Sequence, residues 1–283
     1  MSYISDYPVD EARDLVRNLL TKQLVILEAT VSAAATQAES LDGNEREMLR
    51  VIWVLMRGIA TSTRSVLILT AEFSMGIRDC YGIGRSIFES AVNVAYITAA
   101  GPEVALKARR HAMQKAYRNL LREDPAGLNL PRRAPPTPAE DIAGMVEALG
   151  EFTQKNGSEI TDWAGASVHR KLDAIYSGYP GVQLSMSVAV ASIYRDASEI
   201  LHGTFYGVEL FWEQSLDENG SPRNFDDSFV YNHLITLFTA IFGSINGMLE
   251  VVGQRYATLK TMELVLPLLK EAAGLLSESY SKH

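Results

Sequence analysis

Residues 77–100 decide the fold, and they read IRDCYGIGRSIFESAVNVAYITAA. Their apolar side chains flank one stripe of polar side chains that recur at offsets of three or four residues, and such positions share one face of a helix. The stripe consists of Arg85, Glu89, Asn93 and Tyr96. A helix that is apolar on its other sides is typical of the interior of a helical bundle.

The same helical period continues on both sides of this segment, and no run of residues alternates as a half-buried strand does. We expect helices over residues 9–37, 45–74, 77–100, 103–122, 138–156, 167–175, 184–202, 226–256 and 259–280. The pattern therefore predicts an all-α protein, a single helical bundle of about eight helices. We expect one domain over residues 1–283, in which residues 1–43 form an N-terminal helix packed on a core bundle of residues 44–283.

Several boundaries carry capping signals. Gly101-Pro102 predicts a stop followed by a new helix start. Asn44 and Ser167 are candidate N-caps, and Thr137 followed by Pro138 and Glu140 resembles a capping box.

The composition limits the function classes. The formal net charge of −8 excludes a generally basic surface, so bulk electrostatic capture of nucleic acid is not expected. Cys80 is the only cysteine, which excludes an internal disulfide and a cysteine-based zinc site. The first residues lack a signal-peptide pattern, so we expect a cytoplasmic protein. The apolar stretches 51–73 and 228–249 are interpreted as bundle helices, so no membrane is expected.

A second polar stripe lies on the predicted helix 184–202 and consists of Arg195, Glu199 and His202. Their offsets of four and seven residues place them on one face. His202 precedes Gly203 at the expected helix end, where it either transfers protons or caps the helix. Our leading hypothesis is that this stripe faces Arg85 and Glu89 across the bundle and forms one polar site, whose residues are catalytic if the protein is an enzyme. The alternative for Arg85 and Glu89 is an internal ion pair or a partly wetted groove.

Two motif resemblances attach to this stripe. Arg195 and His202 resemble, at the long limit of its spacing, the Arg/His signature of HEPN-type ribonucleases. That resemblance implies that His202 manages protons and that Arg195 stabilises phosphate charge without a metal. Glu199-x-x-His202 also matches half of a di-iron carboxylate motif, but the second copy is absent from the sequence. We therefore expect no metal and no cofactor.

Three short pieces occur in order along the chain: Arg85-Ser-Ile-Phe-Glu89 with Tyr96 after it, Trp163-Ala-Gly-Ala-Ser167, and Tyr194 with Ser198-Glu199-Ile-Leu-His202-Gly203. Together they resemble an uncharacterised, mainly bacterial helical family known only as domain of unknown function fifty-six seventy-seven. The resemblance implies an α-helical bundle with a shared Arg/Glu/His cluster, and it implies no activity.

These observations leave two classes of function. The first is metal-independent RNA cleavage in bacterial stress or phage defence, with RNA as the partner. The alternative is a non-enzymatic binding or scaffold module whose polar cluster is structural. Gly243-x-x-x-Gly247 predicts a close helix contact, either at a homodimer surface or within one chain.

Overall fold

The structure is a computed structural model that describes residues 9–72, 76–121, 137–212 and 227–281. These residues form helices and connecting turns, and their only β-type pairing is an isolated bridge between Thr153 and Glu159. The predicted all-α class is therefore confirmed.

The described α-helices follow one another along the chain. They are α1 (Val9–Ser40), α2 (Gly43–Leu69), α3 (Gly76–Ala100), α4 (Pro102–Leu121), α5 (Met145–Glu151), α6 (Val168–Gly178), α7 (Gln183–Ala189), α8 (Arg195–Leu201), α9 (Phe205–Trp212), α10 (Asp227–Arg255) and α11 (Thr261–Ser281). A π-helical turn at Val190–Tyr194 joins α7 to α8 in one continuous helix. Turns of this kind occur often at functional positions, and no signal in the sequence predicted this one.

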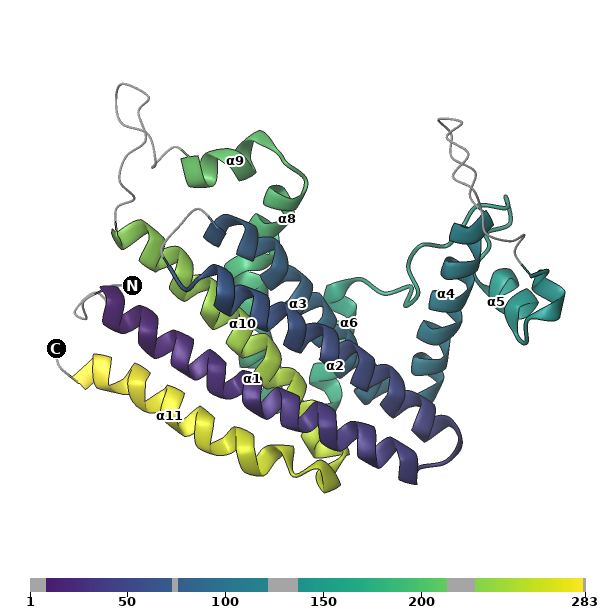
Figure 1. Cartoon of the computed structure of the whole chain (residues 1–283), viewed down its shortest axis with the longest axis horizontal. Coiled ribbons are helices and arrows are strands. Elements are labelled where there is room, and N and C mark those ends of the chain that lie inside the picture. Colours follow the sequence, from purple (N-terminus) through teal and green to yellow (C-terminus); the bar gives the residue numbers. More distant parts are fainter. Residues whose placement is uncertain (1–8, 73–75, 122–136, 213–226, 282–283) are drawn as a thin grey trace.

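Helix α3 lies at the centre of the bundle, between α2 and α10 (Figure 1). Helix α1 packs on α2 and α10, and α11 runs alongside α1 at one edge. Helices α6 and α8 pack on α3, while α4 contacts α2 and carries α5 at the far end of the molecule. One hydrophobic cluster includes side chains from α1, such as Leu20 and Leu27, together with Phe88 of α3 and Phe238 of α10. Burial of this continuous apolar surface is what holds the helices together.

Most of the predicted boundaries agree with the structure. Helix α3 ends at Ala100 and α4 starts at Pro102, as Gly101-Pro102 predicted. Ser167 caps α6, because its side chain accepts a hydrogen bond from the backbone N–H of Arg170. The prediction of Asn44 as an N-cap was wrong: α2 already includes Gly43, and Asp42 takes the cap position without a side-chain cap bond.

The predicted helix 138–156 was also wrong in extent. Only a short 3₁₀ turn forms at Ala139–Asp141, and α5 begins after Gly144. Gly144 has φ of 74°, a left-handed conformation that interrupts a right-handed helix and that glycine adopts without steric cost.

The glycine pair of α10 packs inside one chain. A Cβ atom on Gly243 would lie 2.5 Å from the carbonyl oxygen of Ser185, and one on Gly247 would lie 2.8 Å from Cγ of Met186. The absence of side chains therefore lets α10 approach α7 closely. Of the two alternatives for this motif, the contact within one chain is the one observed.

Two segments are long and apolar enough to cross a membrane by length and composition, Gly43–Leu69 and Asn232–Arg255. The bundle buries 67% of the most apolar window of the second segment but only 33% of that of the first. Core helices of soluble proteins pass the same test of length and composition.

Candidate functional site

The first two residues of the α3 stripe, Arg85 and Glu89, form an ion pair. Nε of Arg85 lies 3.0 Å from Oε1 of Glu89, one helical turn away. The guanidinium also lies 4.6 Å from the ring centroid of Tyr194, the last residue of the π-helical turn. This distance is within the range of a cation–π contact. Arg85 therefore reaches the helix of the second stripe, but its partner there is an aromatic ring.

The second stripe faces outward. Ile193, Ala197 and Ile200 occupy the buried side of this helix, which leaves Arg195 and His202 exposed on the other side. Within the described ranges, neither exposed side chain makes a hydrogen bond or ion pair. Both therefore remain accessible to solvent.

Glu199, the remaining residue of the second stripe, forms a hydrogen bond with Thr204, five residues further along the chain. Its carboxylate accepts a 2.8 Å hydrogen bond from the hydroxyl of Thr204. The structure thus brings Arg85 and Glu89 together, but no hydrogen bond or ion pair among the described residues links them to Glu199 or His202. The catalytic roles of all five residues stay predictions.

The α3 stripe continues towards α6 and the loop before it. Nζ of Lys171 donates a hydrogen bond of 2.9 Å to Oδ1 of Asn93. The same ammonium lies 5.1 Å from the ring centroid of Trp163, whose ring lies 6.4 Å from that of Tyr96. The polar stripe of α3 is therefore completed by a lysine and a tryptophan rather than by the stripe of α8.

Lys171 is a buried cation, with only 7% of its surface exposed. No described carboxylate lies within ion-pair distance of it. Burial lowers the pKa of Lys171, and the more distant charges of Asp162 and Glu89 offset part of that effect. A buried ammonium without an ion-pair partner is unusual, because desolvation of a charge costs several kcal/mol in general.

Lys171 was not among the predicted site residues, although the sequence carries a signal for it. Val168, Leu172 and Ile175 share the buried face of α6, and Lys171 falls on the same face at an offset of three from Val168. A lysine in a core-facing register is the feature that would have identified it.

A groove lies beside this cluster, between α2, α3, α4 and the loop that carries Trp163. Its volume is about 550 Å³. The walls are mostly apolar and include Val51, Leu55, Ile97, Ala108 and Ala112. Asn93 and Trp163, the two residues that contact Lys171, also line the groove.

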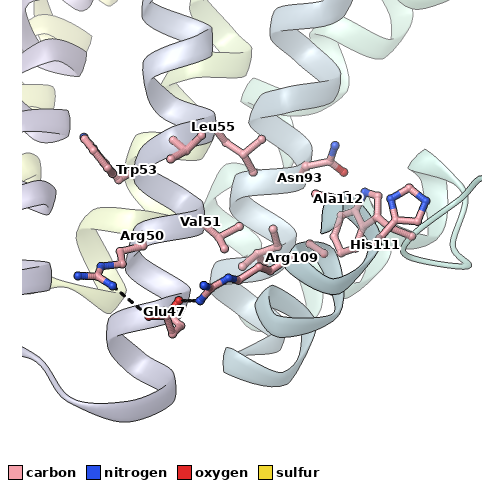
Figure 2. Close-up of a pocket in the computed structure, with 13 residues that line it drawn as sticks. Glu47, Arg50, Val51, Trp53, Leu55, Asn93, Arg109, His111 and Ala112 are labelled. Carbon is pink, nitrogen blue, oxygen red and sulfur yellow. Dashed lines mark hydrogen bonds and ion pairs between the residues drawn. The ribbon is translucent and has the colours of Figure 1, made fainter. Parts of the chain in front are cut away.

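The two ends of the groove differ in charge. Figure 2 shows Glu47, Arg50 and Arg109 together at one end, while Asn93 and His111 lie at the other. Nη1 of Arg50 lies 3.2 Å from the Glu47 carboxylate, and Nη1 of Arg109 pairs with the second oxygen of that carboxylate. Arg50 also lies 3.8 Å from the carboxylate of Glu39, so the charges of the two arginines are matched by two carboxylates, those of Glu47 and Glu39.

A further polar pair lies in the core, away from the groove. The hydroxyl of Tyr81 and Nδ1 of His233 are 2.7 Å apart, and burial lowers the pKa of His233 to about 4. Burial also raises the pKa of the neighbouring thiol, Cys80, to about 11, so this thiol is protonated at neutral pH. At neutral pH the imidazole of His233 is therefore neutral and the thiol of Cys80 is protonated, so neither is in the charged form that imidazolium or thiolate chemistry requires.

No protein-family model matches the chain, and neither does any curated protein or solved structure with which it was compared. The resemblances to the uncharacterised helical family and to HEPN-type ribonucleases stay predictions. The function is therefore inferred from the geometry of the groove and of the two stripes.

Proposed function

We propose that this protein is a non-enzymatic binding module, which takes a small amphipathic molecule into the groove between α2, α3 and α4. The observation that carries the proposal is the groove itself, about 550 Å³ with mostly apolar walls and a polar residue, Asn93, at one end. Sites for small molecules in proteins have this size and this mixture of apolar walls with few polar groups.

The bundle supports this function because the groove walls come from three helices that are fixed by the core. Ile97 is buried beside the groove, and Ala108 packs against the core cluster. Walls that are held by packing lose little conformational entropy when a ligand binds, which favours affinity.

The test is the binding of Nile red, a neutral apolar dye whose fluorescence rises in apolar surroundings. The variant Ala112→Phe fills the groove, and we expect it to reduce the dye signal strongly. Ala116→Phe is the matched control, because Ala116 is also exposed on α4 but does not line the groove. Equal dye binding by both variants would contradict the proposal.

RNA cleavage is the second candidate, for which the exposure of Arg195 and His202 is the favouring observation. Both side chains are accessible on one helix and are not engaged by described partners, as a phosphate-binding pair requires. In this reading the protein acts in the bacterial cytoplasm, as a monomer or a homodimer, in stress or phage defence. The net charge of −8 weighs against it.

The assay for this candidate is incubation with RNA in the presence of a metal chelator. Cleavage by the wild type that is lost in His202→Ala, but kept in His169→Ala, supports the ribonuclease. His169 is a suitable control because it is an exposed histidine on another helix, α6. Inertness of the wild type rejects this candidate and leaves the binding module.

A further inference from the structure

We propose that the ligand of the groove is an apolar monocarboxylate, whose carboxylate binds at the Asn93 end and whose hydrocarbon body lies along the apolar walls. This inference rests on the proposed binding function and specifies its ligand. Three observations carry it: the orientation of the Asn93 amide, the charge of Lys171, and the ion pairs at the opposite end of the groove.

The orientation of the Asn93 amide follows from its partner. A lysine ammonium only donates hydrogen bonds, so the group that faces Nζ of Lys171 is the carbonyl oxygen Oδ1. The amide nitrogen Nδ2 then points away from Lys171, and no described side chain accepts a hydrogen bond from it. Since Asn93 lines the groove, this end offers an N–H donor to the ligand. A ligand oxygen is the complementary group.

The charge of Lys171 favours an anionic oxygen over a neutral one. Lys171 is only 7% exposed, and its ammonium contacts a neutral amide and the face of Trp163. Glu89, one of its more distant carboxylates, is already paired with Arg85. A carboxylate on Nδ2 of Asn93 would be separated from the ammonium by the width of one amide group. It would add a close counter-charge to the more distant charges of Asp162 and Glu89.

The opposite end of the groove differs from the Asn93 end because its cations already form ion pairs. Arg50 and Arg109 share the carboxylate of Glu47, so an anion there would compete with an existing ion pair. Both arginines are also substantially exposed, and exposed ion pairs contribute little because water screens them. The buried charge of Lys171, which has no ion-pair partner among the described residues, therefore attracts an anion more strongly than the arginine end does.

The experiment measures the affinities of octanoate, octanol and octylamine for the wild-type protein by isothermal titration calorimetry. The three probes share one apolar chain and differ only in the head group. We expect octanoate to bind at least about tenfold more tightly than octanol, which corresponds to one charge-assisted hydrogen bond. Octylamine should bind more weakly than octanol, because its charge has the sign of Lys171.

Two variants at the Asn93 end test the assignment of the carboxylate. Lys171→Met removes the charge but keeps a side chain of similar length, and it should reduce octanoate affinity about tenfold without changing octanol affinity. Asn93→Asp places a carboxylate beside Lys171, which pairs with the ammonium and repels octanoate. Because that new ion pair supports the fold, loss of octanoate binding in Asn93→Asp is not a consequence of unfolding.

Lys155→Met and Arg109→Gln are the controls. Lys155 is an exposed lysine outside the groove, and Arg109 belongs to the opposite end. We expect both variants to keep the wild-type preference for octanoate. Loss of that preference in Arg109→Gln, with none in Lys171→Met, would place the carboxylate at the other end and overturn the inference.

The outcomes separate this inference from the function on which it rests. Equal affinity of octanoate and octanol overturns the carboxylate preference but keeps the binding module. Absence of binding by all three probes, together with no Nile red signal, overturns both.

Discussion

Lys171 of α6 and Asn93 of α3, which are 78 positions apart in sequence, form a 2.9 Å hydrogen bond beside the groove. The bond joins a buried cation to a neutral amide, and the face of Trp163 completes the surroundings of the ammonium. Asn93 therefore accepts a hydrogen bond from a cation with which no described carboxylate forms an ion pair. Such an arrangement is costly for stability, and binding of an anion relieves the cost.

The first prediction concerns the stability of Lys171→Met. At neutral pH we expect the variant to be at least as stable as the wild type, because it removes a buried charge that has no ion-pair partner. Urea denaturation measures the free energy of unfolding. A variant that is less stable by several kcal/mol would show that the ammonium holds the fold together, in contradiction to this account.

The pH dependence of the same pair has a defined sign. Burial lowers the pKa of Lys171 in the folded state, so the unfolded chain binds more protons between that lowered pKa and the ordinary lysine value. The contribution of Lys171 to stability therefore rises with pH through this alkaline window. Lys171→Met should lack that rise, whereas Lys155→Met, at an exposed position, should retain it.

His233 provides a second prediction, at acidic pH. Its pKa falls from 6.5 to about 4 on folding, so the unfolded chain binds more protons in this range. The wild type should lose as much as about 3 kcal/mol of stability through this residue as the pH falls across the range. His233→Gln should show a shallower decline in urea denaturation, while His169→Gln should follow the wild type. An unchanged slope in His233→Gln would contradict the assigned burial of the imidazole.

The contact between α10 and α7 makes a third prediction. Gly243→Ala places a methyl group 2.5 Å from the backbone oxygen of Ser185, so the two helices must separate. We expect a loss of about 1–3 kcal/mol in the free energy of unfolding. Gly58→Ala is the matched change in α2, where a Cβ atom meets nothing within 4 Å, and it should raise stability by about 0.5–1 kcal/mol. Equal effects of the two substitutions would argue against the close approach of α10 and α7.

The stacking of Arg85 on Tyr194 makes a fourth prediction. Tyr194→Phe keeps an aromatic ring under the guanidinium and should change stability little. Tyr194→Leu removes the cation–π contact and should cost about 1 kcal/mol in thermal or urea denaturation. If Tyr194→Phe costs as much as Tyr194→Leu, the hydroxyl rather than the ring face is what matters.

Local signals accounted for much of the fold. Gly101-Pro102 ends one helix and starts the next, and Ser167 caps α6, because both effects depend only on the residues themselves. The predicted helix across Gly144 failed because the conformation of a glycine in the left-handed region is not encoded by helical periodicity. The π-helical turn at Val190–Tyr194 has no residue signature, so it was not foreseen either.

The site was predicted less well, because it depends on which helices become neighbours. Arg85 and Glu89 are one turn apart, and their pairing follows from a single helix. The partners of Asn93 and Tyr96 come from α6 and the loop before it, a contact between distant segments that one sequence does not reveal. The spacing of polar residues alone suggested that His202 faces Arg85 and Glu89. In the structure the opposite face of its helix is buried, so His202 is exposed to solvent.

The measurement that tests the central claim most directly is an NMR titration of the Asn93 side-chain amide with octanoate. We predict that the Nδ2 resonances of Asn93 shift on binding and that the same shift needs about tenfold more octanoate in Lys171→Met. Shifts confined to the guanidinium resonances of Arg50 and Arg109, with the Asn93 amide unchanged, would contradict the account.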